Sequence, residues 1–228
     1  MSAAQRMLDI TANNLANAST TAFKGDGLIF QDAFEASLNS DGRDIGQMSY
    51  GVTPGIEFTN RQVGEIQKTG NPLDVAITTP EGAFKVDLGQ GQTRFTRDGS
   101  FHLNDQKVLV DSAGHPVLDD GDRPITLDGN EIDIDSSGQI NVGGQATATL
   151  GVFSGTFVKD GQNLYTCNDS KAMENAGVQS RALEGSNVNA IEAMIQMITL
   201  SRSFDMAQKA VQQHDELSQR LIQSLNGQ

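Results

Sequence analysis

The apolar residues between Glu184 and Leu225 recur every third or fourth position, which is the spacing of one face of an α-helix. From Ala190 onward, no Pro or Gly interrupts the stretch before Gly227. A continuous helix of this length measures about 60 Å, roughly twice the diameter of a small domain. The sequence therefore predicts a projecting helix, of which only the half nearest its domain can serve as a core helix. Its apolar face, here called the seam, comprises Ala190, Ala193, Met197, Leu200, Phe204, Ala207, Val211, Leu221 and Leu225.

A second apolar stripe lies beside the seam in the first half of this helix. It consists of Ile191, Met194, Ile195 and Ile198. A surface helix of a globular domain needs only one apolar face. Two apolar faces on a projecting helix indicate packing against other helices in a coiled coil or bundle.

Residues 1–18 form a second predicted amphipathic helix, with Ser2 as a possible cap and apolar residues at the same spacing. Burial of Leu8 and Leu15 contributes about 1.5 to 3 kcal/mol each, which is less than the cost of ordering about eighteen residues. This helix therefore needs a partner, and the C-terminal helix is the natural one. Amides near its end either fix the register of packed helices or lie at an exposed, frayed terminus. We predict a subunit interface of Leu8, Asn13, Asn14, Leu15, Asn17, Leu200, Phe204, Val211, Leu221 and Leu225.

The segment 25–55 is predicted to be a linker that becomes ordered on assembly, with a surface loop as the alternative. Phe30, Phe34 and Leu38 have the four-residue spacing of a short helix, and 39–44 has the composition of a loop.

From residue 56 to 183, short apolar runs alternate with turn residues, which is typical of an all-β sandwich or irregular barrel. Two hairpins are predicted. One spans 93–103 around a type I′ turn at Asp98 and Gly99, and the other spans 132–142 around Ser137 and Gly138. The predicted fold class is thus α+β, with a terminal helical region (1–24 and 184–228), a linker (25–55) and a β-rich middle domain (56–183).

The formal net charge is −13 and the isoelectric point is near 4.5. This balance argues against nucleic-acid binding, which requires a basic surface. Most of the negative charge lies in the middle of the chain, so the nearly neutral ends can pack in many copies, although a simple solvated acidic surface is the alternative. Cys167 is the single cysteine, which excludes an intramolecular disulfide and favours a small buried side chain. The sequence shows no transmembrane run and no cleavable signal peptide.

The search for catalytic or ligand-binding motifs predicts no enzyme, no cofactor and no metal. The segment 133–138 resembles the start of a calcium loop, but Gly144 stands where a bidentate Glu is needed, so a hairpin turn is the better interpretation. The acidic segment 119–122 is interpreted as a solvated turn. The three histidines have no Cys or carboxylate at ligand spacing.

Four motifs, in order, resemble the signatures of the bacterial flagellar rod and hook proteins, the axial family of the basal body. They are ANNLANASTTAFK (12–24), TGNPLDVAI (69–77), TRDGSF (96–101) and ALEGSNVN (182–189). The resemblance spans almost the whole chain. It implies a rod subunit that polymerises into a helical tube, transmits torque and encloses the export channel, with paired terminal helices inside and the β domain outside.

The resemblance further implies partners and a location: copies of the same chain, other rod and hook proteins, and the flagellar type III export apparatus, in the periplasm-spanning rod of the basal body. Export by that apparatus uses no cleaved signal peptide. Chain length excludes a hook subunit and favours the larger rod proteins. TGNPLDVAI favours the distal rod type, whereas the short 25–55 segment favours its proximal neighbour.

The chain departs from the family pattern in two places. The family usually has two or three further helical turns before the position where this sequence starts, and TTPEGAFKVDLGQG (78–91) stands where a Gly-Asp-Gly turn with paired aromatics is common. The second hypothesis for function is a secreted, self-associating β domain that binds glycan or cell wall. Against it, the chain contains no Trp to form a stacking platform.

Overall fold

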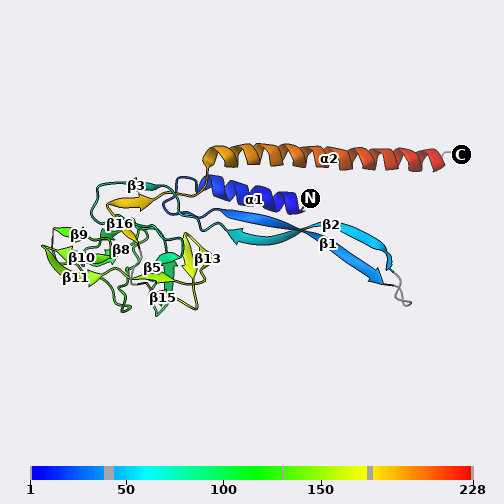
Figure 1. Ribbon diagram of the computed structural model, residues 1–228. Coiled ribbons are helices and arrows are strands. Elements are labelled where there is room, and N and C mark those ends of the chain that lie inside the picture. The colour runs from blue at the N-terminus through cyan, green and yellow to red at the C-terminus, as the bar shows by residue number, and fades with distance from the viewer. Residues whose placement is uncertain (1, 39–43, 130, 174–176, 227–228) are drawn as a thin grey trace. The chain divides into compact units, whose positions relative to one another are not determined.

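The computed structural model describes residues 2–38, 44–129, 131–173 and 177–226, with the side chains of 2–3, 30–55, 218 and 221–226 outside the description. The chain has an α+β fold and divides into two compact units (Figure 1). Unit 1 comprises Met1–Ala16, Asp26–Phe58 and Asn189–Gln228, and unit 2 comprises Asn17–Gly25 and Thr59–Val188. Each unit is therefore assembled from segments that are far apart in the sequence.

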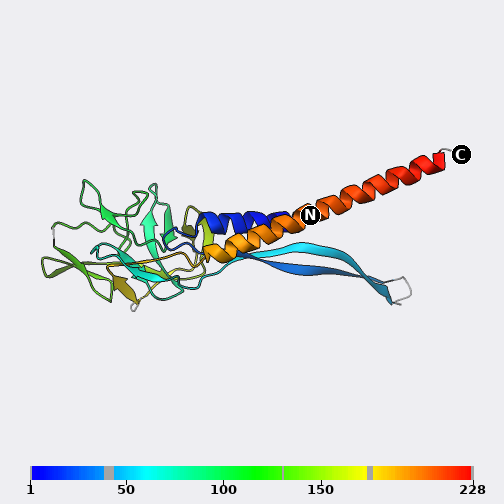
Figure 2. The same ribbon diagram turned by 90° about the horizontal axis from the view of Figure 1, so that it is seen from above.

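Unit 1 contains both helices and a two-stranded sheet. Helix α1 spans Ser2–Ala16 and α2 spans Ala190–Asn226. Helix α1 contacts both α2 and β1. In Figures 1 and 2, α1 runs beside the first part of α2, which continues beyond it. The predicted helix was placed too early, because it begins at Ala190, where the Asn189 carboxamide oxygen accepts the Ile191 backbone N–H at 3.1 Å.

Burial along α2 follows the predicted seam as far as Phe204. Ala193 is buried, and Met197, Leu200 and Phe204 are half-buried. The second stripe lies in solvent, with its four side chains 50 to 72 % exposed. The helix thus has one face that is partly covered within the chain and a second apolar face that is not.

The segment predicted to be a linker with a short helix forms strands instead. Strand β1 spans Asp26–Leu38 and β2 spans Asp44–Thr59, and the two pair with each other. The helix prediction was wrong because a spacing of four is also even, so Phe30, Phe34 and Leu38 share one face of a strand as readily as one face of a helix. The predicted loop at 39–44 lies, except for its last residue, outside the described residues.

Unit 2 is built on a six-stranded antiparallel sheet. Successive residues of a strand point to opposite faces, and both faces of this sheet are apolar. Phe84 and Val152 belong to the main core, whereas Ala83 and Phe153 belong to a smaller aromatic cluster with Phe95 and Tyr165. In spatial order the strands are β13 (Val158–Gly161), β14 (Leu164–Thr166), β6 (Thr93–Thr96), β5 (Gly82–Asp87), β12 (Val152–Ser154) and β15 (Lys171–Ala172).

Smaller sheets complete unit 2, and together they confirm the expected β-rich core. A three-stranded sheet contains β11 (Gln145–Thr149), β10 (Gln139–Val142) and β9 (Ile132–Ile134). The paired strands are β16 (Val178–Ser180) with β4 (Val75–Ile77), β17 (Ala182–Glu184) with β3 (Ile66–Lys68), and β7 (His102–Leu103) with β8 (Leu109–Val110).

One of the two predicted hairpins is confirmed. Strands β9 and β10 pair as expected, with Ile134 opposite Ile140, and Gly138 adopts a positive φ of 86° in the turn. The segment once compared with a calcium loop is this turn, since the Asp135 carboxylate accepts the backbone N–H of Ser137 at 2.9 Å and of Gln139 at 3.0 Å. The acidic segment 119–122 is likewise a turn, in which Asp119 accepts the backbone N–H of Gly121 at 2.9 Å.

The hairpin predicted at 93–103 is wrong. Strand β6 pairs with β5 and β14, whereas β7 pairs with β8 in another sheet. Neither Asp98 nor Gly99 has the positive φ of a type I′ turn. Instead, the Asp98 carboxylate accepts the Ser100 backbone N–H at 3.1 Å, and a Cβ on Gly99 would lie 1.7 Å from the Val75 carbonyl oxygen. Glycine is required there by close backbone contact between the loop after β6 and Val75 of β4, not by turn handedness.

Candidate functional site: a buried clasp at the chain ends of unit 2

Glu184, at the end of β17, is the centre of a buried ionic network in unit 2. Its side chain is 0 % exposed, and those of Lys24 and Arg97 are 1 % and 5 % exposed. The Lys24 ammonium donates to one carboxylate oxygen, which also accepts the Gly64 backbone N–H at 2.9 Å. Arg97 donates to the other oxygen, from Nε at 3.0 Å and from Nη2 at 2.9 Å. Both carboxylate oxygens are therefore occupied.

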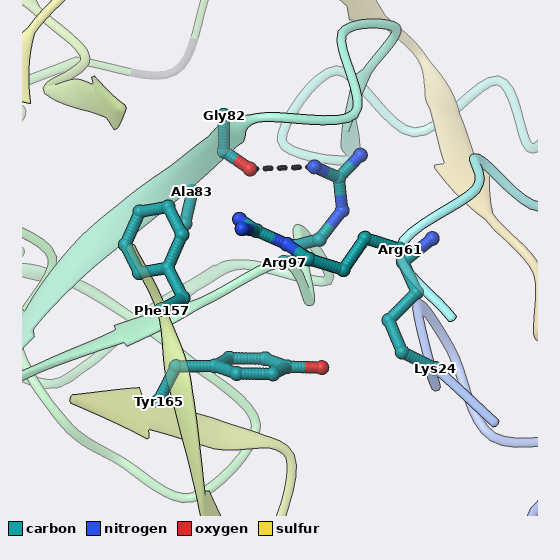
Figure 3. A pocket seen from close by; sticks show the side chains of 7 residues that line it. All are labelled: Lys24, Arg61, Gly82, Ala83, Arg97, Phe157 and Tyr165. Carbon is teal, nitrogen blue, oxygen red and sulfur yellow. Dashed lines mark hydrogen bonds between the residues drawn. The ribbon is translucent and has the colours of Figure 1, made fainter. Parts of the chain in front are cut away.

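Arg97 also ties the network to the backbone that surrounds it. Its Nη2 donates to the Ile77 carbonyl at 3.1 Å, and its Nη1 donates to the carbonyls of Thr79 and Gly82 at 2.9 and 2.5 Å (Figure 3). The Lys24 ammonium donates in addition to the Gln62 carbonyl at 2.7 Å. Burial lowers the pKa of Lys24, and the hydrogen bond and charge of Glu184 oppose that shift. Loss of one partner from such a buried pair typically costs about 3 to 5 kcal/mol, because it leaves an uncompensated charge.

Asn187 ties together the chain entering and leaving unit 2. Its carboxamide oxygen accepts the Gly25 backbone N–H at 2.8 Å, and its amide nitrogen donates to the Asn60 carbonyl at 2.8 Å. Its own backbone N–H donates to the Phe23 carbonyl at 3.2 Å. We call Lys24, Arg97, Glu184 and Asn187 the clasp.

The clasp unites residues from the quoted sequence motifs. Lys24 ends the first motif, Arg97 lies in the third, and Glu184 and Asn187 lie in the fourth. The second motif takes part through its backbone, because Ile77 accepts from Arg97 and Val75 donates to the Gly99 carbonyl at 3.0 Å. Sequence reasoning missed this site. The available signal was a charged residue in each of three motifs, positive in the first and third (Lys24 and Arg97) and negative in the fourth (Glu184).

The predicted interface residues fall into three groups. Leu8, Leu15, Leu200 and Phe204 are half-buried within one chain, whereas Val211 is 50 % exposed. Leu221 and Leu225 lie in α2, but their side chains are outside the described residues.

The third group is the amides near the end of α1. The Asn14 amide donates to the Asp26 carbonyl at 2.7 Å and its oxygen accepts the Asp26 backbone N–H at 2.9 Å. The Asn17 carboxamide oxygen accepts the Thr20 hydroxyl at 3.1 Å. Asn13 is exposed. Within the chain, Asn14 thus holds backbone groups and Asn17 holds a nearby side chain, and a role between subunits stays a prediction.

The groups of the clasp bond to one another or to the backbone, so this site serves to hold together the segments at which the chain enters and leaves unit 2. Within the described residues, no cluster of His, Cys, Asp and Glu has the arrangement of a metal site. Neither described helix is both long and apolar enough to cross a membrane.

Three family models match successive parts of the chain. The model "Flagella basal body rod protein" matches residues 1–24, "Flagellar hook protein FlgE/F/G D1 domain" matches 76–142, and "Flagellar basal body rod FlgEFG protein C-terminal" matches 179–224. Each model covers at least one residue of the motifs that meet at the clasp.

Whole-length relatives agree with the family models. Flagellar basal-body rod protein FlgF of Caulobacter vibrioides is 33 % identical, over 97 % of this chain and 92 % of the relative. FlgF of Rhizobium meliloti is 31 % identical, over 99 % and 94 %. FlgG of Bacillus subtilis is 30 % identical, over 96 % and 93 %. The chain belongs to the flagellar basal-body rod protein family, a family of structural proteins. Because relatives named FlgF and FlgG match at similar identity, identity does not separate the two types.

Proposed function

We propose that this rod protein polymerises into a helical tube through its terminal helices, transmits torque along the rod and encloses the export channel. The observation that carries the proposal is the second stripe of α2. Four large apolar side chains, which are Ile191, Met194, Ile195 and Ile198, are 50 to 72 % exposed on one side of the helix. Exposed apolar patches of this kind mark interaction sites.

Within one subunit, α1 and the first part of α2 form the beginning of a coiled-coil-like bundle. The half-buried seam residues of α2 stop at Phe204, and the next two described seam residues, Ala207 and Val211, are exposed and available to a neighbouring subunit. Leu8, Leu15, Leu200, Phe204, Val211, Leu221 and Leu225 form the interface in this proposal, with Asn13, Asn14 and Asn17 at its edge. Repeated head-to-tail contacts of this type do not close and generate a helical polymer.

The clasp stabilises unit 2 where the chain enters and leaves it. It joins the N-terminal segment to the segment preceding α2, because the Ala22 backbone N–H donates to the Glu184 carbonyl at 2.7 Å. The two helices therefore enter and leave unit 2 from adjacent points of the chain.

The other parts of the proposal rest on family membership. The partners are copies of this chain, other flagellar rod and hook proteins, and the type III export apparatus, which takes up the protein without a cleaved signal peptide. The location is the basal-body rod, and the protein is no enzyme. The glycan-binding alternative is not favoured, because among the described residues Phe95, Phe153 and Tyr165 are at most 6 % exposed and the half-buried Phe157 ring already stacks with Arg61.

The test uses the full-length protein with Ile195→Glu and Ile198→Glu combined. Two charges in a buried helix interface oppose assembly strongly. We expect the variant to remain folded and monomeric, to fail in sedimentation assays of polymer formation, and not to restore swimming. The matched control is Gln196→Glu, at an exposed position on the same turn of helix. A double variant that polymerises like the control contradicts the proposal.

A further inference from the structure

A small hollow lies beside the clasp in unit 2, between β5 and the aromatic cluster (Figure 3). Three cationic side chains line it, namely Lys24, Arg61 and Arg97, together with the rings of Phe157 and Tyr165. The volume open to water is about 10 Å³, which is about what one water molecule occupies. The hollow thus has room for a single oxygen atom, such as one oxygen of a carboxylate whose other atoms lie outside it.

The two arginines around the hollow differ in whether their N–H groups have hydrogen-bond acceptors. All the guanidinium nitrogens of Arg97 donate to Glu184 or to backbone carbonyls. Arg61 differs, because its guanidinium lies 5.0 Å from the centre of the Phe157 ring and, within the described part of the chain, makes no hydrogen bond or ion pair. A stacked, half-buried guanidinium with five free N–H donors is well suited to bind a carboxylate through two parallel bonds.

The charge balance at the hollow also favours an anion. Lys24, Arg61 and Arg97 carry three positive charges, and Glu184 carries the single negative charge of the clasp. The guanidinium groups of Arg97 and Arg61 lie close enough that their charges add to the effect of burial in lowering the pKa of Lys24. An anion beside Arg61 would compensate this excess.

Two carboxylates of the chain lie near Arg61 but leave it unpaired. Arg61 also lines a wider neighbouring hollow that contains Glu81, Asp169 and Lys171. The Asp169 carboxylate is already held by Thr156, from its backbone N–H at 3.0 Å and its hydroxyl at 3.2 Å. Glu81 is exposed and forms no ion pair with Arg61 within 4.0 Å. The wider hollow gives a route from solvent to Arg61.

We propose that Arg61, stacked on Phe157 and backed by Lys24, is a receptor for a carboxylate group. The carboxylate comes either from a small free anion or from an acidic side chain of a second copy of this chain, and the second source rests on the proposed polymer function. The chain carries 29 Asp and Glu against 16 Lys and Arg, so copies offer carboxylates in excess.

The first arm of the experiment titrates the monomeric full-length protein with sodium formate, against sodium chloride at equal ionic strength. The readout is the Nε–H resonance of Arg61 by NMR. We expect formate to shift this resonance saturably, Arg61→Lys to weaken binding at least tenfold, and Lys68→Gln, at an exposed position of β3 outside both hollows, to leave it unchanged. Glu81→Gln, which removes a carboxylate of the wider hollow, should strengthen formate binding.

The second arm measures polymer formation by Arg61→Gln and Arg61→Glu. If formate does not bind the monomer but both variants assemble at least tenfold more slowly while keeping wild-type amide exchange in the core, the carboxylate belongs to a second copy. If formate binds and assembly is unchanged, the ligand is a free anion. Absence of formate binding together with wild-type assembly of both variants overturns the proposal. If the Ile195→Glu and Ile198→Glu variant still assembles, that result contradicts the polymer function alone. Formate binding to the monomer still tests the carboxylate site in that case.

Discussion

Replacement of Glu184 by Gln tests the clasp most directly. The substitution keeps the shape of the side chain but removes its charge, so Lys24 and Arg97 remain in a site that is 1 to 5 % exposed with no anion. Removal of one partner from a buried ion pair costs about 3 to 5 kcal/mol. This is a large part of the 5 to 15 kcal/mol, roughly, that stabilises a typical domain.

Native-state hydrogen exchange measures the loss within unit 2 alone. The backbone amides of Leu109 and Leu127 are suitable probes, since both are buried and donate to the carbonyls of Ile125 and Lys107 at 2.8 and 2.9 Å. A loss of about 3 to 5 kcal/mol accelerates their exchange by roughly 100-fold to several thousand-fold. Lys24→Met should cost less, because Arg97 still compensates Glu184.

The matched control is Asp160→Asn, which breaks the exposed ion pair of Arg94 and Asp160 at 2.7 Å. Exposed pairs of this kind contribute about 1 kcal/mol or less. We therefore expect less than about a tenfold change in exchange for this variant. If Glu184→Gln accelerates exchange no more than Asp160→Asn does, the clasp does not stabilise unit 2, and the reasoning that joins the four motifs through it is refuted.

Three further predictions concern unit 2. Gly99→Ala places a Cβ 1.7 Å from the Val75 carbonyl oxygen, so it should lower the free energy of unfolding by about 3 kcal/mol or more in chemical denaturation. Gly121→Ala is the control and should be nearly neutral. Equal effects of the two substitutions would contradict this prediction. The Ser137 hydroxyl, together with backbone N–H groups, lowers the pKa of Asp135. The stability that the Asp135 carboxylate contributes is therefore present above its unfolded-state pKa and is lost as pH falls through its folded-state pKa. Ser137→Ala should raise the folded-state pKa of Asp135, as measured by NMR titration of its carboxyl group. Burial and the neighbouring Asp169 raise the pKa of the Cys167 thiol, so alkylation of this thiol at neutral pH should be slow. Asp169→Asn should accelerate the alkylation, and an unchanged rate would contradict the prediction.

The parts of the fold that the sequence predicted are those with a distinctive local period. The seam of α2 has a 3-4 spacing that no strand reproduces, and its burial follows that spacing to Phe204. The hairpin of β9 and β10 has alternating Ile residues around a glycine with positive φ. By contrast, β1 was misassigned because a spacing of four is compatible with both helix and strand.

The clasp was not predictable in this way, because it is purely tertiary. Lys24 and Glu184 are 160 positions apart, and neither lies in a local pattern that distinguishes a buried charge from a solvated one. The motif containing Asp98 and Gly99 was interpreted as a hairpin turn, but it is a loop whose backbone passes close to Val75 of β4. Local rules indicated that the chain changes direction there and carried no information about which strands it joins.

The position of the clasp explains how a weak helix can take part in assembly. Helix α1 offers few large apolar residues, and a helix of 15 residues is marginal in isolation. The clasp holds the segment after α1 against the segment before α2, through Asn187 and Gly25 at 2.8 Å, so the two helices start from a common anchor. Both helices belong to one chain, so the clasp shortens the tether between them and raises their effective concentration for each other. A chain with an open clasp would have to recruit α1 from a free end during assembly, and it should polymerise more slowly than wild type even when its helices and β domain are intact.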